Sequence, residues 1–301
     1  MTVPGNVPRP RGADEGARDL PLDSHLHTNL SPDSDVPIDV YAALAAERGI
    51  AELAITDHVD FDARDPAFGY ATYEDRERVA REAAERWAPR GVLIRFGAEL
   101  TWNRAWEADL RAHLERHSYD FVIGSVHDWP DSPYVPSRVR SWAPGLTLAE
   151  ALGPYLAEVT SAARSGLFDT IGHLDVVRRY LHGTFSAADI YEAVELWEPA
   201  LQGLVDSGTA LELNSSGYRH VSGEPYPGPP LLARYRELGG VNVTAGSDAH
   251  RDHHFAWGLE AAYRVLAEAG FPSLAFRRGG ARQSIALPER VTRTGAGGRV
   301  A

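Results

Sequence analysis

Histidine and carboxylate side chains recur along this chain at the ends of short apolar runs. They follow six runs in chain order and are His25 and His27, His58, Glu99, His127, His173, and Asp248 with His250. The carboxyl ends of parallel strands converge in an α/β barrel, so side chains at six strand ends would meet at one point. A ring of imidazole and carboxylate groups there is typical of a site for several metal ions. The pattern predicts a metal-dependent hydrolase.

Two of these groups have the spacing of metal-binding pairs. His25 and His27 lie two residues apart on an expected strand, so both side chains project from the same face. Asp248 and His250 repeat this spacing near the other end of the chain. A single His-x-His pair is as easily two incidental histidines, but further candidates at successive strand ends favour a shared metal site. Small residues beside several candidates let the backbone approach a crowded centre closely.

The composition limits the partners and the metal ligands. The 301 residues are 44% hydrophobic and carry a formal net charge of −12. This length suits one α/β barrel, and the negative charge disfavours nucleic acid, whose phosphates require Lys and Arg. A phosphorylated metabolite would need bound cations to offset the same charge. The chain has no cysteine, so any metal must bind nitrogen and oxygen ligands, which suit Zn, Fe and Mn alike.

The chain is expected to work in the cytoplasm, without a membrane partner. No run approaches the ~20 apolar residues of a membrane span, and the amino terminus lacks a signal-peptide pattern. Residues 1–20 and 291–301 are predicted to be flexible tails on either side of a single catalytic domain, 21–290. Nothing in the sequence indicates the oligomeric state.

Short β-like runs alternate with longer amphipathic stretches, which is typical of a parallel α/β fold. The expected strands are Leu22–His27, Ala51–Asp57, Val92–Leu100, Asp120–His127, Asp169–His173, Thr209–Asn214 and Val241–Ser247. The expected helices are Ile38–Arg48, Glu74–Trp87, Ala105–His117, Leu148–Ser165, Ala187–Asp206, Pro230–Leu238 and Leu259–Glu268. Two long connections, 59–73 and 128–147, follow strands that carry candidate ligands, so we expect both at the mouth of a pocket.

Seven segments together form a recognisable family pattern. They include His-Leu-His in 23–33, Thr-Asp-His in 54–58, Gly-Ala-Glu in 97–100, Gly-Ser-Val-His in 124–127, Ile-Gly-His in 171–180, Asn-Ser-Ser-Gly-Tyr-Arg in 211–219 and Gly-Ser-Asp-Ala-His in 239–250. In these segments the chain resembles the PHP (polymerase and histidinol phosphatase) family, and within it the histidinol-phosphate phosphatase branch. The resemblance implies an α/β fold of the distorted TIM-like (β/α)7 barrel type with a trinuclear metal site.

By position, the resemblance implies overlapping ligand sets for two or three divalent metal ions. The sets are His25, His27, Glu99 and Asp248 for one ion; Glu99, His127 and His173 for a second; and His58 and His250 for a third. Some family members have a histidine where this chain has Asp33. Aspartate can still bind a divalent cation, but the change leaves the occupancy and metal preference of the third site open. Asp57 is interpreted as a supporting group and not as a ligand.

The resemblance also implies hydrolysis without a covalent phosphoenzyme. Two cations would neutralise the phosphate oxygens and lower the pKa of a bridging water held by Glu99, His127 and Asp248. Arginines would complete the phosphate clamp, because the guanidinium fork matches phosphate oxygens. The candidates are Arg219 and either Arg178 or Arg179. No residue is assigned as the general acid.

The leading hypothesis is a phosphomonoesterase of histidine biosynthesis that hydrolyses L-histidinol phosphate to L-histidinol and phosphate. The alternatives are a family phosphatase for another small phosphorylated metabolite, and a non-catalytic or proofreading-like module. An amidohydrolase-like enzyme that cleaves C–N bonds also carries His-x-His on its first strand. Such enzymes usually have a metal-bridging lysine, and no lysine stands at a strand end here.

Overall fold

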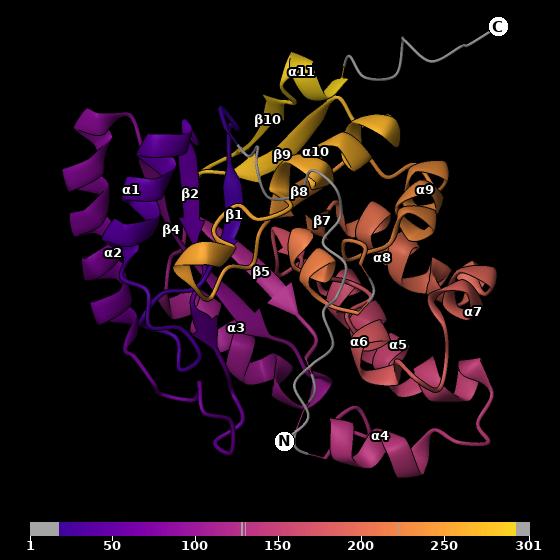
Figure 1. Ribbon diagram of the computed structural model, residues 1–301. Helices are drawn as coiled ribbons and strands as arrows, with labels where there is room; N and C mark the ends of the chain where they lie inside the picture. Colours follow the sequence, from indigo (N-terminus) through magenta and orange to yellow (C-terminus); the bar gives the residue numbers. More distant parts are fainter. Residues whose placement is uncertain (1–17, 128, 130, 222, 293–301) are drawn as a thin grey trace, which may run out of the picture.

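Seven parallel strands form the centre of the computed structural model, which describes residues 18–127, 129, 131–221 and 223–292 (Figure 1). They pair in the order β1-β2-β4-β5-β6-β7-β8. Their bounds are β1 Asp23–Leu26, β2 Glu52–Ile55, β4 Leu93–Thr101, β5 Phe121–Ser125, β6 Thr170–Ile171, β7 Ala210–Asn214 and β8 Val243–Gly246. A two-residue strand, β3 (His58–Val59), pairs with the end of β4. All seven predicted strands are therefore present.

The segment after β8 brings the two edge strands together. The amide of His27 donates to the carbonyl oxygen of Ala249 at 3.0 Å, and the amide of Asp248 donates to that of His25 at 2.8 Å. These bonds make a nearly closed barrel. The predicted TIM-like (β/α)7 barrel is confirmed.

Helices surround the strands. In Figure 1, α1 and α2 lie beside β1, β2 and β4, and α5, α8 and α9 lie on the opposite side. The bounds are α1 Ile38–Arg48, α2 Tyr73–Trp87, α3 Glu107–Arg116, α4 Pro136–Trp142, α5 Leu148–Ser165, α6 Val177–Leu181, α7 Ala187–Glu192, α8 Glu198–Ser207, α9 Pro229–Glu237, α10 Leu259–Glu268 and α11 Glu289–Thr292. The strands are almost wholly buried, as expected for a parallel sheet covered by helices.

Local signals in the sequence account for several helix ends. Thr147 and Ser186 begin α5 and α7 with capping boxes, in which side chain and backbone satisfy each other's hydrogen bonds. Gly49 and Gly166 end α1 and α5 in the left-handed conformation that glycine adopts without a steric cost. These ends match the predicted ones.

The predicted helix Ala187–Asp206 is not one continuous helix. The structure has α7, then a 3-10 turn (Val194–Trp197), then α8. Pro199 lies in the first turn of α8, where its missing N–H is harmless. The same residue would break a hydrogen bond in the middle of a longer helix.

The predicted placement of connection 128–147 at the pocket mouth also needs correction, and Asp128 and Pro130 lie outside the described residues. Residues 136–142 form α4, and Tyr134 packs against the rings of Trp129, Trp142 and Tyr155. The buried aromatic contacts hold this segment against α5. The structure contains a cavity of about 750 Å³. None of the described residues of connection 128–147 lines this cavity, whereas residues of connection 59–73 do.

A two-stranded antiparallel hairpin near the carboxyl end was not predicted. Its strands are β9 (Ser273–Arg277) and β10 (Arg282–Ala286), and β9 packs against β8. Arg277 pairs with Asp169 and Arg278 with Glu52, both at 2.6 Å. These ion pairs hold the hairpin against the residue before β6 and the first residue of β2.

The predicted tails fall mostly outside the described residues, which exclude 1–17 and 293–301. Their innermost described residues pack in the core, since Leu20 and Val291 are each 1% exposed. In the part of the chain that the structure describes, no helix is both long and apolar enough to cross a bilayer. The exact domain boundaries remain a prediction.

Candidate metal centre

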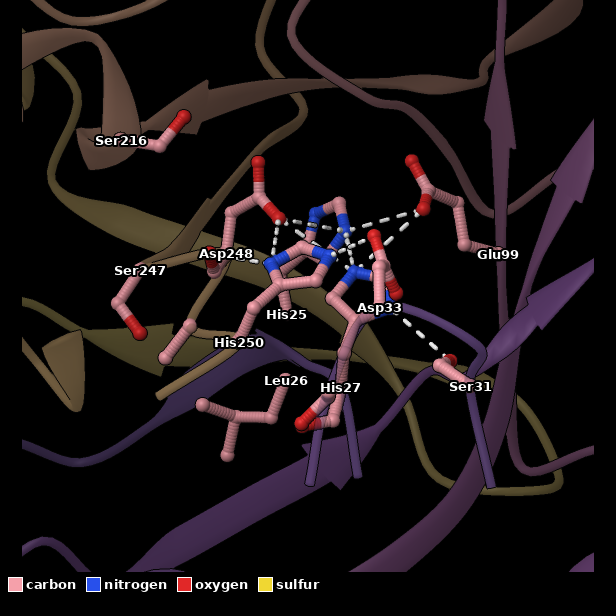
Figure 2. Close-up of polar contacts among 12 residues, drawn as sticks. His25, Leu26, His27, Ser31, Asp33, Glu99, Ser216, Ser247, Asp248 and His250 are labelled. Atoms are coloured by element: carbon pink, nitrogen blue, oxygen red, sulfur yellow. Dashed lines mark hydrogen bonds and ion pairs between the residues drawn. The ribbon is translucent and has the colours of Figure 1, made fainter. Parts of the chain in front are cut away.

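The six predicted strand ends meet around Glu99. This residue lies inside β4 and is 1% exposed, and the pairing register of β3 places His58 directly beside it. Figure 2 shows six side chains pointing toward one another from four separate parts of the chain: those of His25, His27, Asp33, Glu99, Asp248 and His250. The structure thus brings together residues that are up to 225 positions apart, as 250 minus 25 gives.

The first predicted ligand set is compact. The Nε2 atoms of His25 and His27 lie 3.0 Å apart, and Oδ1 of Asp248 is 3.4 Å from Nε2 of His27. Oε2 of Glu99 is 3.5 Å from both Nε2 atoms. Four atoms with lone pairs therefore face a common point.

The second predicted set shares Glu99 through its other oxygen. Oε1 of Glu99 is 2.9 Å from Nε2 of His173 and 3.3 Å from Nε2 of His127. The two imidazole nitrogens are 3.4 Å apart. His127 and His173 come two residues after the ends of β5 and β6, which are neighbours in the sheet.

The third predicted set includes Asp33. Its Oδ2 is 3.0 Å from Nε2 of His250 and 3.4 Å from Nε2 of His58, and those nitrogens are 3.4 Å apart. Asp33 is half exposed, whereas His25 and His27 are fully buried. The third set therefore lies at the open side of the cluster.

Burial and opposite charges set the protonation of the cluster. Burial opposes the charge on Glu99, but the surrounding histidines outweigh it and hold its pKa well below the usual range. The pKa of Asp248 is also held well below its usual range, because nearby histidines, chiefly His25, outweigh the effect of burial. Burial likewise opposes protonation of His25, yet Glu212, Asp248 and Glu99 raise its pKa well above normal. The pKa of His27 is lowered, first by burial and then by His250 and His58.

The donor set fits divalent metal ions. Nitrogen ligands at about 2.0–2.1 Å around one tetrahedral ion lie roughly 3.3 Å from each other, which matches the separations given above. Oε2 of Glu99 is buried and accepts no hydrogen bond, although Nδ1 of His58 lies 2.8 Å away. Three groups drawn from these residues could hold an ion: His27, His58 and His250; His25, His27 and Asp248; and His58, Glu99 and His127.

Two ligand candidates have backbone conformations that are uncommon for residues with side chains. His173 has a φ of 26° and Asp248 a φ of 52°. Each is held by a hydrogen bond from its own amide, to Glu212 Oε2 and to the His25 carbonyl oxygen respectively. Such conformations cluster at functional sites, because the surrounding structure must enforce them.

Comparison with known proteins identifies the family. The sequence profile described as the PHP domain matches residues 23–216, which contain β1 to β7. The chain belongs to the PHP family. The resemblance noted from the sequence motifs is therefore confirmed.

Curated PHP relatives share most of their length with this chain. A protein of Deinococcus radiodurans named "Probable histidinol-phosphatase" is 30% identical over 261 residues, 85% of this chain and 96% of the relative. The histidinol-phosphatase of Lactococcus lactis subsp. lactis is 25% identical over 84% of this chain and 93% of its own. The predicted histidinol-phosphatase branch of the family is confirmed by these relatives.

A solved structure shares the fold. Histidinol phosphate phosphatase from Lactococcus lactis, in complex with zinc, L-histidinol and phosphate, superposes with a TM-score of 0.73 at 23% identity. The match covers 87% of this chain and 98% of that one. The PHP barrel is therefore the same overall in the two proteins.

Buried carboxylates outside the ligand sets stabilise this PHP site. Asp57 accepts hydrogen bonds from the amide and hydroxyl of Thr28 and from Ser31, whose hydroxyl in turn accepts from the amide of His58. Asp23 accepts from the amide and hydroxyl of Ser247. The two carboxylates fix the loops after β1 and β8, which carry candidate ligands.

The structure separates the three arginine candidates. Arg219 and Arg179 line the cavity of about 750 Å³, whose lining also includes the candidate ligands other than His25 and His27. Arg178 does not line it: its guanidinium is buried against Asp175 and donates to the carbonyl oxygen of Pro225. Of the pair Arg178 and Arg179, only Arg179 lines this cavity.

Several cavity residues were not predicted from the sequence. His220 and His254 were not among the candidates, yet both line the cavity, as do Asp60 and Asp65 of connection 59–73, which was expected at the pocket mouth only as a segment. Glu212 is the most deeply buried of the missed groups and touches His25 directly. The sequence signal that could have revealed Glu212 is an acidic residue between two leucines, in the middle of a strand that is expected to be buried.

Proposed function

We propose that this chain is a metal-dependent phosphomonoesterase that hydrolyses L-histidinol phosphate to L-histidinol and phosphate. The observation that carries the proposal is the convergence of three ligand sets on Glu99 in a chain whose curated relatives are histidinol-phosphatases. In this proposal the protein works in the cytoplasm, and its substrate is a small molecule and not a nucleic acid.

The proposed metal sites follow the predicted sets. The ligands are His25, His27, Glu99 and Asp248; Glu99, His127 and His173; and Asp33, His58 and His250. Two or three ions of Zn, Fe or Mn suit these nitrogen and oxygen donors. When bound, divalent cations stabilise charge on phosphate oxygens and acidify the attacking water.

The cavity residues orient the substrate in this proposal. Arg219 and Arg179 place guanidinium donors where phosphate oxygens arrive, in a site whose carboxylates would otherwise repel a dianion. Asp60 and Asp65 line the same cavity and suit the ammonium or imidazole group of histidinol. A volume of about 750 Å³ leaves room for both parts of such a substrate.

A substrate panel tests the proposal. Under one metal condition, kcat/KM for histidinol phosphate is expected to exceed that for glucose 6-phosphate, AMP and an aryl phosphate by about 100-fold or more. The reason is that a substrate without a cationic group would bury Asp60 and Asp65 without a positively charged partner. Equal rates across the panel would support phosphatase activity but contradict the proposed preference for histidinol phosphate. No turnover of any monoester would reject the phosphatase.

Replacement of Arg219 by lysine is expected to weaken substrate binding. The change keeps one positive charge but removes the guanidinium fork, so kcat/KM should fall about 10- to 100-fold, mostly through KM. Arg219 also donates to the carbonyl oxygens of Ser247 and Asp248 at 2.8 Å. Bound metal must therefore be measured beside the kinetics.

The exposed Arg116 on α3 supplies the matched control, Arg116→Lys, with unchanged kinetics. A normal KM in Arg219→Lys would contradict a phosphate contact. Loss of metal with an unchanged KM would show that Arg219 serves only to hold the Asp248 loop.

Replacement of Asp33 by alanine is expected to empty the third site alone. Asp33 contacts only His58 and His250 among the proposed ligands, so bound metal should fall by about one ion per chain, with at least about tenfold weaker affinity at that site. Elemental analysis after dialysis measures this. Asp35→Ala, at an exposed neighbouring carboxylate, should keep the full complement. Unchanged metal in Asp33→Ala would remove Asp33 from the ligand set.

A further inference from the structure

We propose that Glu212 is a positioning residue that holds ligands of two different metal positions with one carboxylate. The inference rests on the proposed metal centre. Glu212 lies in the middle of β7, is 0% exposed, and does not line the substrate cavity. It therefore acts through other residues and not on the substrate.

One oxygen of Glu212 fixes the orientation of His25. Oε1 lies 2.7 Å from Nδ1 of His25. A carboxylate only accepts hydrogen bonds, so Nδ1 must carry the proton of that bond. The lone pair of Nε2 then faces Nε2 of His27, 3.0 Å away. Glu212 thereby selects the tautomer in which His25 can bind an ion of the first set.

The other oxygen fixes the backbone of His173. Oε2 accepts from the amide of His173 at 2.9 Å and from Nδ2 of Asn214 at 3.0 Å. The first of these bonds holds His173 in its left-handed conformation, with φ of 26°. Its Nε2 is thereby kept 2.9 Å from Glu99 Oε1, in the second set. One side chain of β7 thus contacts two proposed ligands: His25 in β1 and His173 just after β6.

Two glycines make space for this carboxylate. A Cβ atom at Gly246 would lie 2.9 Å from Oε1 of Glu212 and 2.3 Å from Cβ of His25. A Cβ atom at Gly172 would lie 3.4 Å from Oε2 and 2.7 Å from Oγ of Ser125. The close packing leaves Glu212 little freedom to move between its two partners.

The geometry predicts that one isosteric change weakens two metal positions. In Glu212→Gln, whichever way the amide is turned, its NH2 group faces a donor, either Nδ1–H of His25 or N–H of His173. Loss of a partner that orients a ligand typically costs 10–100-fold in metal affinity. Both the first and second sets should weaken by about this factor, while the Asp33 set is unchanged.

Metal titration of the whole chain tests this. Metal-free protein is titrated with Zn²⁺ against a chromophoric chelator, and bound metal is counted by elemental analysis. Wild type should bind two or three ions, and Glu212→Gln should lose affinity for two of them together. Glu52→Gln is the matched control: Glu52 is a buried strand glutamate, 1% exposed, that pairs with Arg95 and Arg278 instead of the cluster. It should keep wild-type affinity.

The outcomes separate this inference from the proposed function. Wild type that binds no Zn²⁺ would overturn the metal centre and the inference with it. Wild-type affinity in folded Glu212→Gln would overturn the inference alone, as would an equal loss in Glu52→Gln. Far-ultraviolet circular dichroism in a chelator checks folding.

A second variant covers the case in which Glu212→Gln does not fold. Asn214→Ala keeps the carboxylate but removes the amide that holds its Oε2 and that also donates to Asp248 Oδ2 at 3.3 Å. Its metal affinity should fall about tenfold. Unchanged affinity in Asn214→Ala would then overturn the inference.

Discussion

Removal of divalent metal is expected to abolish turnover of phosphate monoesters. Without cations, a phosphate dianion would meet the carboxylates of Glu99, Asp248 and Asp33, whose pKa values are all held below the usual range. The chain carries a net charge of −12, which adds to the repulsion. We expect a loss of at least about 10³-fold, because charge stabilisation by a single donor is already worth 10²–10³.

The experiment compares the rate before chelation, after chelation and dialysis, and after addition of Mn²⁺, Zn²⁺ or Fe²⁺. Circular dichroism of the chelated protein establishes that the barrel is still folded. Full activity that persists in the dialysed, metal-free protein would exclude the metal mechanism. Recovery with one ion only would identify the preferred metal.

Glu99→Gln is expected to be the most damaging single substitution. Glu99 is shared by the first two sets, through Oε2 to His25 and His27 and through Oε1 to His127 and His173. The amide keeps the shape of the side chain but loses the charge and turns one acceptor into a donor. Two ions should be lost and kcat should fall by at least about 10³-fold.

Glu115→Gln serves as the control, because Glu115 is exposed on α3 and belongs to none of the ligand sets. Elemental analysis and kcat measured at high metal concentration distinguish weak binding from loss of function. Near-normal metal content and rate in Glu99→Gln would contradict its shared position between two ions.

The convergence of the candidate ligands could be predicted from the sequence because most of them lie at or just beyond the end of a recognisable strand. Runs of buried aliphatic residues end at small residues and then at a histidine or carboxylate, as at Gly172 before His173. In a parallel barrel these ends must converge, so local patterns suffice to predict a common centre. Asp33 was predicted by its distance from His27 in a family motif, and it lies 3.0 Å from His250.

Residues whose role depends on packing were harder to predict. Glu212 lies within a strand and not at its end, so the strand-end pattern does not mark it. His254 ends η5 (Asp252–His254) and His220 follows η4 (Ser215–Arg219); both line the cavity, but neither lies at the end of an expected strand. The choice between Arg178 and Arg179 needed the structure, because adjacent residues on a short helix point in different directions.

The β9–β10 hairpin was missed for a different reason. Its strands contain Arg277 and Arg282, and β10 is largely exposed, so the sequence resembles a polar carboxyl-terminal segment more than a pair of core strands. Its partners, Asp169 and Glu52, are more than 100 residues away in the chain. Pairing over such distances leaves no local signal.

The left-handed backbones of His173 and Asp248 set a limit on improving this protein by selection for heat resistance. For residues with side chains, this conformation costs on the order of 1–3 kcal/mol, and glycine would relieve it. Glycine, however, has no imidazole or carboxylate to offer. A screen that rewards melting temperature alone would therefore favour inactive variants at these two positions, and such a screen must score turnover as well.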